Sequence, residues 1–148
     1  MKKIIKNVYY IFLPIILGSI IGFIIKDYMD YQMLLKPPLS PPKIAFPIAW
    51  SIIYILMGLA YYFYKRKTDD KNYIYYIGLI INLLWSIIFF VLKWRFISIL
   101  WIILLDILVI LTMKKFKKYN KISVYLFIPY LLWILFATYL TIGIFILN

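Results

Sequence analysis

Hydrophobic positions along this chain gather into five long runs, and the short segments between them hold nearly all of the charges. Each run can cross the hydrocarbon core of a bilayer, for which a helix needs about 20 residues. The strict alternation of apolar and polar residues that marks a membrane β-barrel is absent. The pattern predicts an all-α membrane protein, a five-helix transmembrane bundle. We expect the helices at about 8–26, 44–65, 72–92, 96–114 and 122–147.

No internal repeat divides the chain, so we expect one domain over residues 1–148. The longest connection, about 27–43, contains four prolines: Pro37, Pro38, Pro41 and Pro42. Proline fixes φ and has no N–H, so this segment cannot be helical and is expected to be stiff and extended. Because it runs directly into an apolar span, we interpret it as a lid over a pocket.

The composition removes most enzyme chemistries. The chain is 66% hydrophobic, which is too apolar for a soluble domain of this size, and it has no cysteine, histidine or glutamate. These absences exclude zinc sites, haem ligation through His or Cys, disulfides, thiol chemistry and a Ser-His-Asp triad. We therefore expect no metal site and no required cofactor.

The net charge of +12 predicts orientation rather than nucleic-acid binding, because the charges lie between hydrophobic runs. Twelve of the 17 basic residues precede the first run or lie in the second and fourth connections. Basic residues accumulate on the cytoplasmic side of a membrane. We expect an N-terminus in the cytoplasm and a C-terminus outside, in a bacterial cell membrane.

Aromatic residues recur at helical spacing on three runs, so each set shares one face of its helix. Spacing alone leaves two alternatives open, helix packing with lipid contact or a ligand-binding wall. The three stripes contain Trp50 and Tyr54; Asn82, Trp85 and Phe89; and Trp133 with Ala137.

Two polar residues inside the runs need partners within the membrane. Asn82 either bonds across helices or contacts a ligand, because an unpaired amide is costly in hydrocarbon. Asp106 is expected to face the bundle interior, either protonated and bonded to a neighbouring helix or acting as a proton relay.

Together these residues resemble the TspO family, the tryptophan-rich sensory proteins that include the mitochondrial translocator protein. The resemblance covers nearly the whole chain. It rests on Gly18 to Gly22, Leu35 to Pro37, Ser40 to Pro42, Trp50, Tyr54, Met57-Gly58, Asn82 to Trp85, Phe89-Phe90, Asp106, Pro129 to Trp133, Phe136-Ala137 and Asn148.

The resemblance implies a five-helix bundle, usually a homodimer, with a pocket beneath the first loop for porphyrins, haem-related tetrapyrroles, sterols and synthetic ligands. A porphyrin or haem-like molecule would thus be a ligand. The implied pocket residues are Trp50, Asn82, Phe89, Trp133 and Ala137, with Tyr31 in the lid and Tyr54 and Trp85 beside them.

Two departures from the family pattern bear on function. Asp30 stands where many relatives have a lid tryptophan, and the last span carries no basic residue for the proposed cholesterol motif. Tetrapyrrole binding is therefore favoured over sterol binding.

We expect a membrane-embedded binding protein for porphyrins and similar planar hydrophobic molecules, acting as a sensor, carrier or scavenger. One alternative is a porphyrin-degrading enzyme that depends on light and oxygen and uses Trp50, Trp133 or Tyr31. Another is a sterol or tetrapyrrole transporter that uses Asp106. The expected partners are the ligand, the lipid membrane and a second copy of the chain, and not nucleic acid.

Overall fold

A computed structural model describes all 148 residues, and its five long helices confirm the all-α fold. Each of the five is long and apolar enough to span a membrane when α3 is taken with the π-helical turn η2 that continues it. The one further element, η1, is a single 3₁₀ turn. The elements are α1 (Lys2–Ile25), η1 (Tyr31–Met33), α2 (Ala45–Lys65), α3 (Tyr73–Ser86), η2 (Ile87–Val91), α4 (Arg95–Tyr119) and α5 (Lys121–Leu147).

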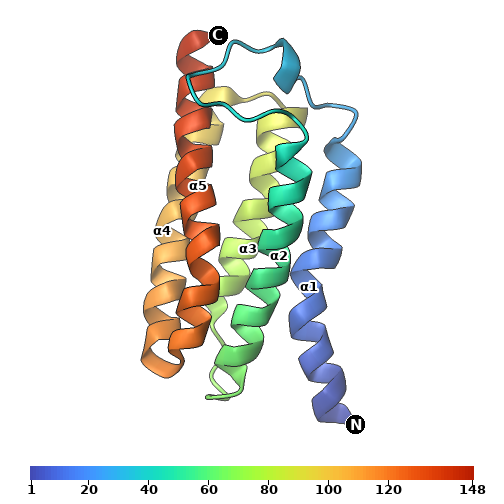
Figure 1. Cartoon of the computed structure of the whole chain (residues 1–148), viewed down its shortest axis with the longest axis vertical. Helices are drawn as coiled ribbons and strands as arrows, with labels where there is room; N and C mark the ends of the chain where they lie inside the picture. Colours follow the sequence, from blue (N-terminus) through green and yellow to red (C-terminus); the bar gives the residue numbers. More distant parts are fainter.

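The helices form a closed ring in the order α1, α2, α5, α4, α3, with α3 returning to contact α1 (Figure 1). An odd number of spans places the termini at opposite ends of the bundle. At the end that holds the N-terminus, tyrosine and phenylalanine rings fill the interior. Tyr61 stacks on Tyr75 with ring centroids 4.4 Å apart, and Phe116 and Phe127 are fully buried beside them. This end of the bundle is closed by packing.

Two of the helices extend beyond their apolar runs. Helix α1 begins at Lys2, and α4 continues to Tyr119, so that Lys117 and Lys118 lie within its last turn. Hydrocarbon thickness limits the apolar part of a helix but not the helix itself. Cationic side chains near a helix C-terminus also interact favourably with the partial negative charge there.

The short connections are fixed by side chains. The Asn72 side chain accepts a hydrogen bond from the Tyr75 N–H at 3.3 Å at the start of α3. Asn120 does the same for Ile122 at 3.0 Å, and its amide also donates to the Phe63 carbonyl of α2 at 2.9 Å. These bonds satisfy backbone donors that a helix start leaves unpaired. The connection between α1 and α2, residues 26–44, is the one large loop. It crosses the opposite end of the bundle (Figure 1).

Candidate functional site

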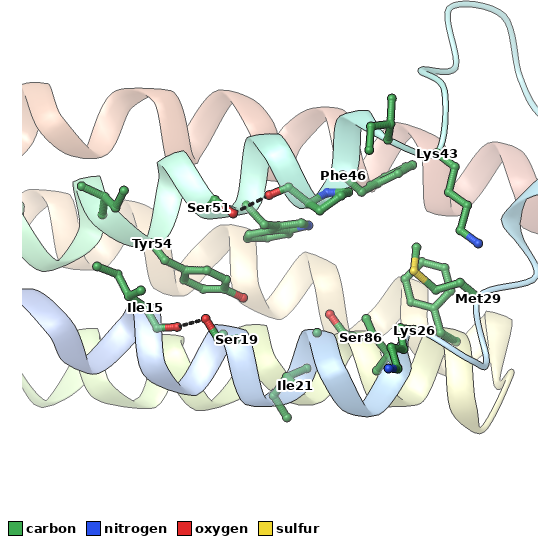
Figure 2. Close-up of a pocket in the computed structure, with 18 of the residues that line it drawn as sticks. Ile15, Ser19, Ile21, Lys26, Met29, Lys43, Phe46, Ser51, Tyr54 and Ser86 are labelled. Carbon is green, nitrogen blue, oxygen red and sulfur yellow. Dashed lines mark hydrogen bonds between the residues drawn. The ribbon is translucent and has the colours of Figure 1, made fainter.

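A cavity of about 650 Å³ lies between α1 and α2, beneath the lid (Figure 2). Small residues of α1 make room for it. A Cβ added at Gly22 would meet no atom within 4 Å, so this glycine faces open space. The α3 side contributes Ser86 and Phe90. The other principal wall residues are Ile21 and Ile25 of α1 and Phe46, Trp50 and Tyr54 of α2.

An aromatic pair forms the flat wall of this cavity. Trp50 and Tyr54 are one helical turn apart on α2, and their rings stack with centroids 5.4 Å apart and an interplanar angle of 25°. Gly18 of α1 makes the arrangement possible, because a Cβ at this position would overlap the Tyr54 ring. The wall offers an aromatic face to any flat molecule that enters.

Trp133 and Tyr31 form a second layer behind this wall. The Trp133 ring meets Trp50 edge-on at 6.3 Å and Phe46 at 6.0 Å, and the Tyr31 ring meets Phe46 at 4.8 Å. Neither Trp133 nor Tyr31 lines the cavity itself. Both act on the site by fixing the rings that do.

Asn82 links three helices. Its side-chain oxygen accepts a hydrogen bond from the Tyr54 hydroxyl at 2.9 Å, and its amide donates to the Tyr130 hydroxyl at 2.8 Å. The residue is buried and does not line the cavity. Of the two alternatives for this amide, the structure contains the bonds across helices, and through Tyr54 these bonds reach the cavity wall.

The remaining predicted site residues are packed in the bundle. Trp85 stacks on Phe89 with centroids 5.1 Å apart, and the guanidinium of Arg95 covers the Phe89 ring at 4.2 Å. Ala137 is buried in the core on α5. None of Trp85, Phe89 and Ala137 lines the cavity.

Hydrogen bonds within the lid hold its shape. The Tyr31 hydroxyl donates to the Pro41 carbonyl at 2.6 Å, and burial raises the pKa of this hydroxyl, so it remains a donor. The Lys36 ammonium donates to the carbonyl oxygens of Tyr31 and Leu34 at 3.0 and 2.9 Å. Leu39, highly exposed, adopts a left-handed backbone with φ 66° at the turn between the proline pairs.

The lid is also anchored to two other parts of the bundle. Asp30 accepts a hydrogen bond from the Arg95 guanidinium at 2.7 Å, which ties the lid to the start of α4. The Asn148 side chain pairs with both backbone groups of Leu35 at 3.1 and 2.8 Å, and the Tyr139 hydroxyl donates to the Pro38 carbonyl at 2.7 Å. The lid therefore closes the bundle end through specific bonds.

Asp106 lies away from the cavity, between α4 and α5. The Thr138 hydroxyl donates to one of its carboxyl oxygens at 2.8 Å, while the other oxygen is buried without a partner. Asp106 faces the interior, as expected for an acid inside a span, and its hydrogen-bond partner comes from the neighbouring helix.

Sequence reasoning missed several residues that line the cavity. Lys26 and Lys43 are not among the predicted site residues, and Gly18 and Gly22 enter the sequence analysis only as part of the family resemblance, yet all four line the cavity. The sequence feature that could have indicated the cavity is the group of small residues Gly18, Ser19 and Gly22 in the first run, together with the bulky aromatic residues of the second run. Small residues leave either a tight contact or a space, and only the positions of the opposing side chains decide which.

Comparisons with known proteins find similar sequences over most of the chain. A model of the TspO/MBR family matches residues 10–147. The chain is 36% identical over 124 residues to the tryptophan-rich protein TspO of Chlorobaculum tepidum, covering 80% of this chain and 78% of that protein. It is 38% identical over 124 residues to the protein of the same name from Archaeoglobus fulgidus, covering 80% and 79%. The tryptophan-rich sensory protein of Cereibacter sphaeroides is 31% identical over 119 residues, covering 79% and 75%.

Proposed function

This chain belongs to the TspO/MBR family of membrane proteins, and we propose that it binds porphyrins and similar planar hydrophobic molecules as a sensor, carrier or scavenger. The observation that carries the proposal is the cavity between α1 and α2, with the stacked Trp50 and Tyr54 as its flat wall. Its volume of about 650 Å³ lies within the range of about 300–1,000 Å³ that is usual for small-molecule sites.

The physical basis of the proposal is a match of shape and polarity. A flat ligand can stack on an indole and a phenol ring, and mainly apolar walls favour transfer of its body out of water. The hydroxyls of Ser19 and Ser51 donate to backbone carbonyls of their own helices, at 2.7 and 2.6 Å. Because these donors are already paired, an apolar ligand beside them leaves no hydroxyl donor without a partner. The anchored lid would limit the exchange of a bound molecule with water.

A titration with protoporphyrin IX tests this proposal, with the Soret band of the porphyrin as the signal. We expect saturable binding to the wild-type protein, and a loss of about tenfold or more in affinity for Trp50→Ala, because the stacking face is removed. Trp94→Ala is the matched control, since Trp94 is exposed at the turn before α4 and does not line the cavity. Equal affinities in the three proteins would contradict the proposed site.

A second candidate function is the degradation of bound porphyrin in the presence of light and oxygen. It is favoured by the edge contact of Trp133 with Trp50. Trp50 lines the cavity and Trp133 lies directly behind it, so two neighbouring indoles are available for redox chemistry. The test compares bound-porphyrin absorbance under light and oxygen in wild type and Trp50→Phe at equal occupancy. Phenylalanine keeps a stacking face but lacks the indole, so bleaching to a defined product by wild type alone would support the enzyme. Equal bleaching would support the binding protein.

We further propose that the protein lies in a bacterial cell membrane as a homodimer, with its N-terminus in the cytoplasm. The orientation is supported by the gathering of basic residues at the bundle end that holds the N-terminus. The dimer is what the family resemblance implies, and the apolar outer faces of the helices, where large hydrophobic side chains such as Phe12, Ile80 and Leu104 are exposed, can contact either lipid or a second copy. Native mass spectrometry of the detergent-solubilised protein tests the dimer.

A further inference from the structure

We infer that the cavity selects tetrapyrroles that carry carboxylates at one edge, and that Lys26 and Lys43 pair with these carboxylates. The inference rests on the proposed function and adds the polar group that the ligand must have. Lys26 follows the last turn of α1, and Lys43 directly precedes the first turn of α2. Both line the cavity, and Figure 2 shows them at the same end of it, on the α1 side and on the α2 side.

The two ammonium groups have no anionic partner in the protein. The ion pairs of this chain join Asp30 to Lys93 and Arg95, and Asp70 to Lys115. The Lys26 ammonium lies 4.1 Å from the centroid of the Phe23 ring, a contact that does not neutralise its charge. None of the five aspartates lines the cavity. This end of the cavity therefore holds two ammonium groups that form no ion pair with the protein, although the exposed Asp27 follows Lys26 in the chain.

The rest of the cavity has the opposite character. Trp50, Tyr54 and Phe90 form aromatic surface, and the isoleucines of α1 form aliphatic surface. A cavity with charge at one end only fits an amphiphile with an apolar body and anionic groups along one edge. A tetrapyrrole with two neighbouring propionates has this form, and two lysines on opposite sides of the opening can each take one carboxylate. Near the membrane surface such pairs are less screened than in water.

The experiment compares protoporphyrin IX with its dimethyl ester, using full-length protein in phosphatidylcholine nanodiscs. The wild type is expected to bind the diacid more tightly than the ester. The double variant Lys26→Gln/Lys43→Gln is expected to lose about fivefold to twentyfold in affinity for the diacid and to bind the ester as the wild type does. Lys117→Gln/Lys118→Gln is the matched control, because it removes the same charge at the opposite end of the bundle, where both side chains are exposed.

Several results would overturn the inference. One is an unchanged diacid affinity in the Lys26/Lys43 variant, and another is an equal loss in the control or for the ester. A third comes from a parallel set of nanodiscs that also contain phosphatidylglycerol: loss of bound phosphatidylglycerol in the Lys26/Lys43 variant, without any effect on the porphyrins, would assign the lysines to a lipid headgroup. If the wild type binds neither porphyrin, the proposed function itself fails. If it binds both equally, only the carboxylate inference fails.

Discussion

Asn82 shows how a single polar side chain can organise the interior of this bundle. Its carbonyl and amide are bonded to tyrosine hydroxyls of two different helices, Tyr54 on α2 and Tyr130 on α5. Tyr54 is also part of the cavity wall, stacked on Trp50. The hydrogen bond from Tyr54 to Asn82 therefore fixes the orientation of a residue in the cavity wall, although Asn82 itself does not line the cavity.

Substitution of Asn82 by leucine is expected to destabilise the protein, because two buried hydroxyls lose their partner. We expect the free energy of unfolding to fall by about 1–3 kcal/mol. Adding Tyr54→Phe and Tyr130→Phe removes the unpaired hydroxyls, and this triple variant should recover most of the loss. Thermal unfolding in detergent, followed by circular dichroism, measures the three proteins. A triple variant less stable than Asn82→Leu would show that the hydroxyls have other partners.

Packing between α1 and α2 depends on where each glycine lies along the pair. At Gly58, the backbone of Ile11 occupies the space that a Cβ would need, whereas at Gly22 the corresponding space is open. The two helices thus approach closely near the N-terminal end of the bundle and leave a cavity near the lid. A backbone contact cannot move aside as a flexible side chain can, so the helices must separate to admit a methyl group.

The two glycines make a matched pair of alanine substitutions. Gly58→Ala is expected to lower the free energy of unfolding by about 1–3 kcal/mol through overpacking. Gly22→Ala is expected to leave it unchanged or to raise it by up to about 1 kcal/mol, because alanine favours the helix. Unfolding of both variants under identical detergent conditions gives the comparison. A similar cost at both positions would show that glycine flexibility, rather than contact with Ile11, is decisive.

The lid is the element that the bundle holds through polar contacts. Its ion pair from Asp30 to Arg95 is largely sheltered from solvent, with side-chain exposures of 19% and 15%. A sheltered pair contributes more than an exposed one, because removing one partner leaves the other charge unpaired.

Asp30→Asn is expected to loosen the lid without unfolding the helices. Amide hydrogen exchange over about residues 28–36 should accelerate several-fold, while exchange in α4 and α5 stays slow. Asp27→Asn is the control, since Asp27 is exposed and forms no ion pair. Unchanged exchange in the Asp30 variant would mean that the bonds of Asn148 and Tyr139 suffice to hold the lid.

At the scale of the whole molecule, the two ends of the bundle differ in charge and in packing. One end is closed by buried aromatic rings and surrounded by most of the basic residues; the other is covered by the lid and contains the cavity. If basic residues mark the cytoplasmic side, the cavity opens in the outer half of the membrane.

Cysteine labelling tests this orientation, and the chain has no native cysteine to interfere. Met33→Cys places a thiol in the lid and Lys67→Cys places one at the opposite end, and both native side chains are exposed. We expect a membrane-impermeant thiol reagent to label Met33→Cys in intact cells and Lys67→Cys only after lysis. The reverse pattern would reject a cytoplasmic N-terminus.

The number of helices, the non-helical proline-rich loop and the shared helix face of Trp50 and Tyr54 followed from the sequence itself. Hydrocarbon thickness sets the length of an apolar run, proline excludes helix, and a spacing of four puts Trp50 and Tyr54 on one face. These are local properties, so they need no knowledge of the neighbouring elements.

Only the tertiary structure decided which helix faces enclose empty space. The sequence placed Asn82, Trp85, Phe89, Trp133 and Ala137 on plausible faces, but the order of helices around the ring brings the Gly22 face of α1 to the cavity instead. Lys26 and Lys43 are 17 positions apart and line the same cavity only because the lid returns the chain to α2 beside α1. A cavity forms where the side chains of neighbouring helices leave space unfilled, and this depends on the packing of several helices at once.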